Sequence, residues 1–194
     1  IENGGGGIMD KGLVIFSGGN RNEYTQFWPG VYHRVIGVSA TTHRDTKAWY
    51  STFHEKLDIA APGGETNTAS GGSLVDGGRM GILSTITVAN GSVGYQQGTS
   101  MAAPHVTGVA ALIISQARGR VSADDVKSYL LLYTDPIEPL LSAQVKGRMG
   151  TGRLNAFNSI ERTAAYVANT EVAAPANFAY TPLCDGVRLE WQNI

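Results

Sequence analysis

The chain of 194 residues is poor in cysteine, in charge and in long apolar runs. Its single cysteine, Cys184, excludes an internal disulfide and leaves the redox compartment open. Charged residues make up 16%, against about 25% in typical soluble domains, and the formal net charge is -1. These values give no support for nucleic acid or an anionic membrane as a partner. No apolar run approaches the ~18 residues of a membrane span, so none is expected.

Glycine is abundant, at 25 residues, and 42% of the chain is hydrophobic, which is enough for one sizeable core. Short apolar runs predict buried strands at 13–16, 35–40 and 57–61, and a hairpin-like pair at 82–88 and 93–97. Longer periodic runs predict helices at 101–117, 123–133 and 154–167. Ser122 and Asp125 resemble a capping box for the second helix. Residues 64–79 predict an exposed, mobile loop. The fold class is therefore α/β, a mostly parallel sheet with flanking helices and a short β tail.

The chain divides into a main unit and a tail. Residues 1–168 form the main domain, 169–176 resemble a linker, and 177–194 alternate apolar and polar residues as in the truncated start of a β-sandwich. Two strands alone cannot bury a core, so we expect the tail to be cut short or docked. The first residues have neither the basic nor the apolar region of a signal peptide, and the chain begins as if in the middle of a longer one.

The segment from Gly98 to His105 is where the chemistry concentrates. A serine after Gly-Thr at a helix start has an exposed hydroxyl, and the unpaired N–H groups of the first turn face any negative charge that develops there. Acyl transfer needs both. Taken alone, Ser100 fits an ordinary N-cap at least as well. Pro104 is expected to be tolerated because the first turn does not need its N–H.

The longer string GTSMAAPHVTGVAALI resembles the nucleophile motif of the subtilisin-like serine peptidases almost residue for residue. VIFSGGN, VIGVSAT, LDIAAPGG and GTGRLNAFNSI resemble further segments of that family, in its chain order, over roughly residues 8–168. The resemblance implies a partial subtilisin-like fold and a serine endopeptidase. It makes Ser100 the nucleophile and Asn20 an oxyanion donor, although Asn20 after two glycines also fits a plain turn. Thr99 either orients Asn20 or only caps the helix. The tail APANFAYTP…GVRLEW resembles the start of a fibronectin type III module.

The other two members of the family's triad, an Asp and a His, should precede Asn20, but no His does and the only acids there are Glu2 and Asp10. The four histidines are His33, His43, His54 and His105. His105 lies five residues from Ser100, about 140° around a helix, and is expected to pack with a satisfied ring N–H. His54 is expected at the surface or in a loop, and a zinc site is not expected.

Two interpretations remain: a fragment of an endopeptidase that is inactive alone, or a non-catalytic scaffold or binding module with the same fold. A nucleotide-binding reading of the glycines at 4–7 fails, because they precede a strand instead of following one. The endopeptidase reading implies a peptide or protein substrate and the missing N-terminal half of the domain as partners. Half of a parallel sheet exposes an apolar edge, so we expect this chain alone to be marginally soluble or to self-associate.

The family comparison also bears on the substrate and the surroundings. Ser17, Gly18 and Gly19 match one wall of the pocket for the residue before the scissile bond, and the loop 21–30 its floor. Phe27 and Trp28 there indicate either a narrowed pocket or plain loop packing. No cofactor is implied for catalysis. Structural calcium is a family feature, for which Asp45 or Asp58 are candidate ligands, although solvated or capping acids fit them better. Secretion or cell-surface display is implied by analogy.

Overall fold

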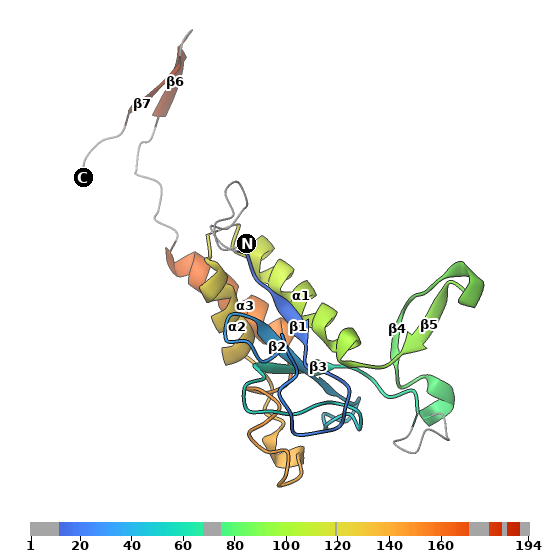
Figure 1. Cartoon of the computed structure of the whole chain (residues 1–194). Coiled ribbons are helices and arrows are strands. Elements are labelled where there is room, and N and C mark those ends of the chain that lie inside the picture. Colours follow the sequence, from blue (N-terminus) through green and yellow to red (C-terminus); the bar gives the residue numbers. More distant parts are fainter. Residues whose placement is uncertain (1–11, 68–74, 119, 171–178, 184–185, 191–194) are drawn as a thin grey trace.

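The computed structural model describes residues 12–67, 75–118, 120–170, 179–183 and 186–190 (Figure 1). Three strands, β1 (Ile15–Ser17), β2 (Ile36–Thr41) and β3 (Ile59–Pro62), form a parallel sheet in the order β1-β2-β3. Three helices follow, α1 (Thr99–Gln116), α2 (Ala123–Leu132) and α3 (Ala156–Thr170). The α/β class and the parallel sheet that the sequence predicts are thus confirmed, with boundaries shifted by one to three residues.

The main core lies between the sheet and the three helices. All of β2 is buried, and its alternate residues Ile36, Val38 and Ala40 pack with Ile59 of β3 against α1. The helix contributes Val106 and Ile113, and α2 contributes Val126 and Leu130. Because successive side chains of a strand point to opposite faces, these residues all belong to one face of the sheet. Burying them stabilises the packing of α1 across the three strands.

A smaller cluster covers the opposite face of the sheet. Ala60 of β3 packs there with Phe53 and with Ile137, Leu141, Val145 and Met149, which belong to the segment that leads from α2 to α3. That segment includes the short 3-10 helix η3 (Glu138–Leu140). Ser39 of β2 is fully buried on this side and donates from Oγ to the Met149 carbonyl, at 2.8 Å. The buried hydroxyl therefore has the partner that burial requires.

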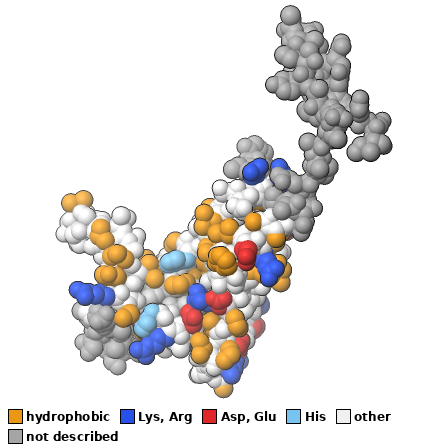
Figure 2. All heavy atoms as spheres, turned by 180° about the vertical axis from the view of Figure 1, so that it is seen from behind, with side chains coloured by type: hydrophobic (Ala, Val, Ile, Leu, Met, Phe, Trp, Pro, Cys, Tyr) orange, Lys and Arg blue, Asp and Glu red, His pale blue; other side chains and the backbone are white. Residues whose placement is uncertain are grey.

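A hairpin precedes α1. Its strands β4 (Ile82–Thr85) and β5 (Val93–Gln96) are antiparallel and flank the 3-10 turn η2 (Val88–Asn90). Figure 1 shows it projecting away from α3, and Figure 2 shows hydrophobic side chains along it. Four of them are exposed, Leu83, Val88, Val93 and Tyr95. The hairpin is shorter than its predicted strands because residues 88–90 turn.

The expectation of a mobile loop over 64–79 is only partly right. The side chain of Gln97 accepts a hydrogen bond from the Thr66 N–H and donates one to the Asn67 side chain, both at 2.6 Å. Residues 75–78 form a further 3-10 turn, η1 (Val75–Gly78). Residues 68–74 lie outside the described part of the chain. Polar side chains here hold the loop's ends to neighbouring segments, which composition alone does not reveal.

Helix α2 begins as predicted. The Ser122 Oγ accepts from the Asp125 N–H at 3.1 Å, and an Asp125 carboxylate oxygen accepts from the Ser122 N–H at 2.9 Å. The Ser122 hydroxyl also donates to the Asp125 carboxylate, at 2.7 Å, and this bond together with the one from the Ser122 N–H holds the pKa of Asp125 below its usual value. Helix α1 ends at Gln116; Gly119, which as a glycine after the apolar run is a plausible helix stop, lies outside the described residues. None of the described helices is long and apolar enough to cross a membrane.

Helix α3 continues to Thr170, two residues past the predicted end of the main domain at 168, and residues 171–176 of the predicted linker 169–176 are not described. Beyond them, β6 (Ala179–Leu183) pairs antiparallel with β7 (Gly186–Glu190). Two tail strands are thus present, within the predicted range 177–194. The likeness to a fibronectin module stays a prediction.

Candidate active site

Ser100 stands in the first turn of α1, just after a turn that only glycine forms readily. The helix is preceded by Gly98, whose φ of 147° and ψ of 161° lie in a region that L side chains avoid. Gly98 is buried, and its N–H lies within hydrogen-bond distance of the Gly63 carbonyl (3.1 Å) and the Tyr50 hydroxyl (3.0 Å). Ser100 itself is exposed. The turn thus anchors the backbone and leaves Ser100 exposed to solvent.

Asn20 lies beside this turn, held by the residue that precedes the serine. Its Oδ1 accepts two hydrogen bonds from Thr99, one from the backbone N–H and one from the hydroxyl, each 2.9 Å long. The Thr99 hydroxyl, 1% exposed, also accepts from the Gly19 N–H at 3.2 Å. Because Oδ1 faces donors, the amide orientation is fixed by its network and Nδ2 is the outward group. Thr99 therefore binds the Asn20 side chain through two hydrogen bonds.

The amide nitrogen of Asn20 lies close to the glycine turn. A Cβ atom added at Gly98 would stand 3.4 Å from Asn20 Nδ2. The N–H of Ser100 belongs to the first helical turn, where helix geometry supplies no acceptor. Two sets of N–H donors thus gather around the approach to Ser100, one from the Asn20 side chain and one from the helix start. Such donors stabilise negative charge on an acyl oxygen when they are fixed in advance.

Pro104 corrects one sequence expectation. Since α1 begins at Thr99, Pro104 lies in the second turn and not the first. Its missing N–H is the one that would otherwise bond to the Ser100 carbonyl, four residues earlier. The helix therefore lacks one internal hydrogen bond directly beneath the serine, and the exposed proline ring stands on the same face of the helix.

Ser100 lies between two open depressions. One has a volume of about 660 Å³ and is lined by β1 and the outer face of α1. The other, about 490 Å³, lies between β4 and the same helix. Both are largely apolar, and they share Ser100, Pro104 and Gly108. An extended chain crossing the serine therefore meets apolar surface on either side of it.

The predicted substrate wall lies at the end of β1. Ser17 lines the larger depression, and Gly18 is fixed to the next strand by its N–H bond to the Val38 carbonyl, 2.7 Å long. A Cβ at Gly18 would meet that same carbonyl at 2.8 Å, so this position admits only glycine without a shift. Gly19 follows with a φ of +100° and is buried. The three residues thus lead directly into Asn20, as the family comparison implies.

No histidine among the described residues is placed to serve Ser100. The Nδ1 of His105 lies 2.8 Å from the Met101 carbonyl of its own helix, which agrees with the packing role expected of it. His43 pairs with Arg44 at the surface, and the ring of His33 lies tilted against Tyr32, with the ring centres 4.5 Å apart. His54 corrects an expectation: it lies in a loop but is 4% exposed, with its ring stacked on Tyr24 at 5.0 Å.

The candidate calcium ligands already have cationic partners. Asp58 Oδ1 lies 3.2 Å from Lys127 Nζ, while its Oδ2 accepts from the Gly37 N–H at 2.8 Å. Asp45 Oδ1 lies 2.7 Å from Arg153 Nε. Within the part of the chain that the structure describes, no three His, Cys, Asp or Glu side chains gather closely enough to hold a metal ion. Asp45 and Asp58 are thus each paired with a basic side chain, and structural calcium stays a prediction.

A turn at residues 47–52 contacts both the Gly98 turn and the loop that follows Asn20, and the sequence analysis does not predict it. The buried Tyr50 hydroxyl, besides meeting the Gly98 N–H, donates to the Gly64 carbonyl at 2.7 Å. Its pKa is raised by burial. Lys47 Nζ donates to Asn22 Oδ1 at 2.7 Å and to three carbonyls of the turn, and burial lowers its pKa to about 8. No sequence pattern marks the contacts with Gly64, Asn22 and Gly98, which join positions 14, 25 and 48 residues apart.

The same fold occurs in solved proteases. The structure of a protease from Pseudoalteromonas arctica matches with a TM-score of 0.65 and 31% identity, over 78% of this chain and 42% of that one. The prenylagaramide maturation protease PagA matches with a TM-score of 0.60 and 26% identity, over 78% of this chain and 50% of that one. The sheet, the helices and the glycine turn before Ser100 thus form the fold of subtilisin-like proteases.

The sequence comparisons identify the same family of proteins. The model of the subtilase family matches residues 2–159. A thermophilic serine proteinase of Bacillus sp. strain AK1 is 32% identical over 82% of this chain, and thermitase of Thermoactinomyces vulgaris is 30% identical over 77%. The chain belongs to the subtilase family of serine proteases. It spans only 34% of the first of these relatives and 44% of the second.

Proposed function

We propose that this chain supplies the nucleophile and the oxyanion site of a serine endopeptidase. Ser100 Oγ attacks the carbonyl carbon of a peptide bond, and the negative oxygen that forms is held by Asn20 Nδ2 and the Ser100 N–H. The observation that carries the proposal is the double hydrogen bond from Thr99 to Asn20 Oδ1, which turns the amide nitrogen outward beside the serine. A plain turn asparagine has no need of that orientation.

The reaction needs a base to take the serine proton and give it to the leaving amine, and a carboxylate to orient that base. We propose that both come from polypeptide outside this sequence, because none of the described histidines faces Ser100. The chain by itself is then inactive on peptides. No cofactor enters these steps, since proton transfer and acyl transfer account for them. The polypeptide partners are the substrate and the segment that carries the base.

The surface beside Ser100 suits that second segment. Strand β1 pairs only with β2 among the described strands, so its other edge is open for a further parallel strand. Phe16 on β1 and Leu112 on the outer face of α1 are 38% and 51% exposed. The larger depression lies between these two elements. We propose that the N-terminal part of the same catalytic domain packs here and brings its base to the hydroxyl of Ser100.

Location outside the cell or at its surface is part of the proposal. The supporting facts are the names of relatives: an extracellular basic protease of Dichelobacter nodosus, 38% identical over 59% of this chain, and a cell wall-associated protease of Bacillus subtilis, 29% identical over 76%.

The test is labelling by a fluorophosphonate, which reacts with an activated serine. We expect the natural polypeptide that contains this chain to be labelled at Ser100, and S100A to lose the label. The control is S115A, which removes an exposed serine of the same helix and should keep it. A folded protein that is not labelled, from a gene without upstream triad residues, would instead establish the non-catalytic scaffold.

A further inference from the structure

Phe27 lies against Gly19, the residue that precedes Asn20 in the proposed oxyanion site. In the proposed reaction the scissile carbonyl lies between Ser100 Oγ and Asn20 Nδ2. The residue that owns this carbonyl, called the acyl-side residue below, carries its Cβ only about 2.5 Å from the carbonyl carbon by covalent geometry. In the proposed geometry its side chain therefore starts within a few ångströms of the Asn20 amide, and Gly19 directly precedes Asn20 in the chain.

The open side of Gly19 is covered by an aromatic ring. A Cβ added at Gly19 would lie 2.6 Å from Phe27 Cγ and 2.9 and 3.0 Å from its two Cδ atoms. Three ring atoms at similar short distances mean that the ring lies against the glycine backbone. The neighbouring Gly18 faces the other way, toward Val38 and Leu57 in the sheet. The end of the wall nearest Asn20 therefore presents a phenyl ring to any ligand.

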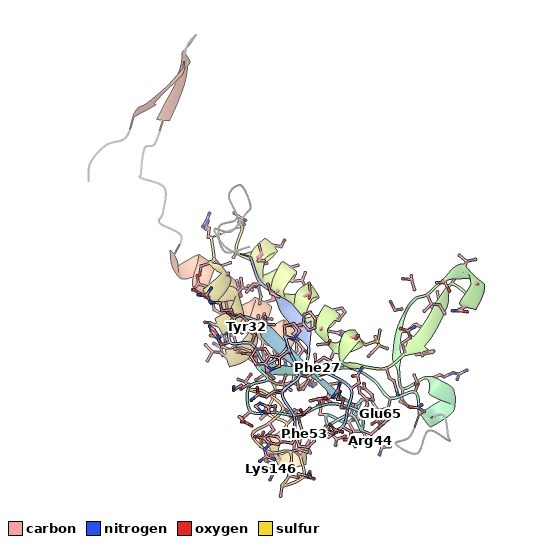
Figure 3. All side chains as sticks on the ribbon, in the orientation of Figure 1. Phe27, Tyr32, Arg44, Phe53, Glu65 and Lys146 are labelled. Atoms are coloured by element: carbon pink, nitrogen blue, oxygen red, sulfur yellow. The ribbon has the colours of Figure 1, made fainter. Side chains whose placement is uncertain are left out.

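The ring is held in place from both sides. Its loop lies directly on the wall, because a Cβ added at Gly30 would meet the Ser17 carbonyl at 2.8 Å and the Phe27 carbonyl at 3.2 Å. The guanidinium carbon of Arg21 stands 5.9 Å from the ring centre, within the range of a cation–π contact. Phe27 is half-buried, and Figure 3 shows it among the loops below the sheet. Trp28, by contrast, is 58% exposed and packs near Tyr32.

We propose that Phe27 is a specificity-determining residue that closes the acyl-side subsite to large side chains, so that the enzyme cleaves after glycine, alanine or serine. This inference rests on the proposed function, since it places the scissile carbonyl at Ser100 and Asn20. A large aromatic acyl-side residue meets the Phe27 ring before its carbonyl reaches Asn20. A methyl or hydroxymethyl group ends before that contact.

The test compares peptide p-nitroanilides that differ only in the acyl-side residue, alanine, leucine or phenylalanine, with the natural polypeptide that contains this chain. One methylene in an apolar pocket changes kcat/KM by about 10- to 200-fold. A phenyl group that does not fit should therefore lower kcat/KM by at least about 100-fold relative to alanine. F27A should bring the phenylalanine substrate to within about 10-fold of the alanine one, with F27L in between.

The matched control is W28A, which removes the adjacent aromatic ring and should leave the order of the three substrates unchanged. If F27A is unstable, F27L and the wild-type ranking still decide the matter. Equal cleavage after phenylalanine and alanine by the wild type, or an unchanged ranking in F27L and F27A, overturns the inference.

Fluorophosphonate labelling of Ser100 in the same preparations separates the two proposals. Labelled enzyme with the wrong ranking refutes the role of Phe27 alone. Folded enzyme that is neither labelled nor active refutes the proposed function, and the role of Phe27 falls with it.

Discussion

Replacing Thr99 with valine removes one hydroxyl and tests how the site is held together. Valine keeps the branched shape inside a position that is 1% exposed. It takes away the acceptor of the buried Gly19 N–H and one of the two donors to Asn20 Oδ1. A buried N–H without a partner costs about 1–3 kcal/mol of stability. We expect the free energy of unfolding to fall by that amount.

The same substitution should lower turnover. With one of its two anchors gone, the Asn20 amide samples orientations that turn Nδ2 away from the acyl oxygen. Complete loss of such a donor costs about 10²- to 10³-fold in turnover, a magnitude measured on subtilisin, a member of this family. Partial misorientation should therefore lower kcat by about 10- to 100-fold with little change in KM.

The assay is steady-state hydrolysis together with urea unfolding, both on the natural polypeptide that contains this chain. T99S is the control: it keeps the hydroxyl and removes one methyl group, which should cost about 1 kcal/mol and little activity. If T99V and T99S have the same kcat, the hydroxyl does not orient Asn20, and the reasoning about the site is refuted.

Three further substitutions test the surroundings of the site. Y50F removes the buried hydroxyl that donates to Gly64 and should cost about 1–3 kcal/mol in urea unfolding; an unchanged midpoint contradicts the bracing role. G98A forces a side chain to a φ of +147° and should lower stability and turnover together, whereas wild-type kinetics would show that the turn tolerates one. S122A should cost about 1 kcal/mol at pH 7. Because Ser122 lowers the pKa of Asp125, this stabilisation is present above about pH 4 and is lost as the pH falls through the lower folded pKa. Thermal melts from pH 7 to pH 2 check this, and a pH-independent difference would refute it.

The elements were predictable wherever local pattern and packing agree. The runs that became β1, β2 and β3 are short, apolar and bounded by glycine or turn residues, and Ser122 and Asp125 are three residues apart, as a capping box requires. Boundaries were less predictable. Pro104 was placed in the first turn of its helix and lies in the second, because the helix begins two residues earlier, at Thr99.

The contacts that build the site were not predictable from pattern. Lys47 looks like any surface lysine in the sequence, yet its ammonium is enclosed by four oxygens. His54 was expected in a loop or at the surface and lies buried in a loop, because Tyr24 stacks on it. The contacts of Lys47 with Asn22 and of His54 with Tyr24 form only when distant loops pack together. The residues near each partner in the sequence do not predict that packing.

By itself the sequence determined the family, the order of strands and helices, and which serine and which asparagine are the candidates for the chemistry, because these follow from local propensity and from a long, specific motif. Only the tertiary structure decided how they cooperate. Thr99 meets Asn20 across 79 residues of sequence, and Phe27 comes to rest on Gly19. Hydrogen bonds and steric contacts act over a few ångströms in space. Which residues make these contacts therefore depends on how the folded segments are arranged in space, and the distance between two residues along the sequence does not reveal it.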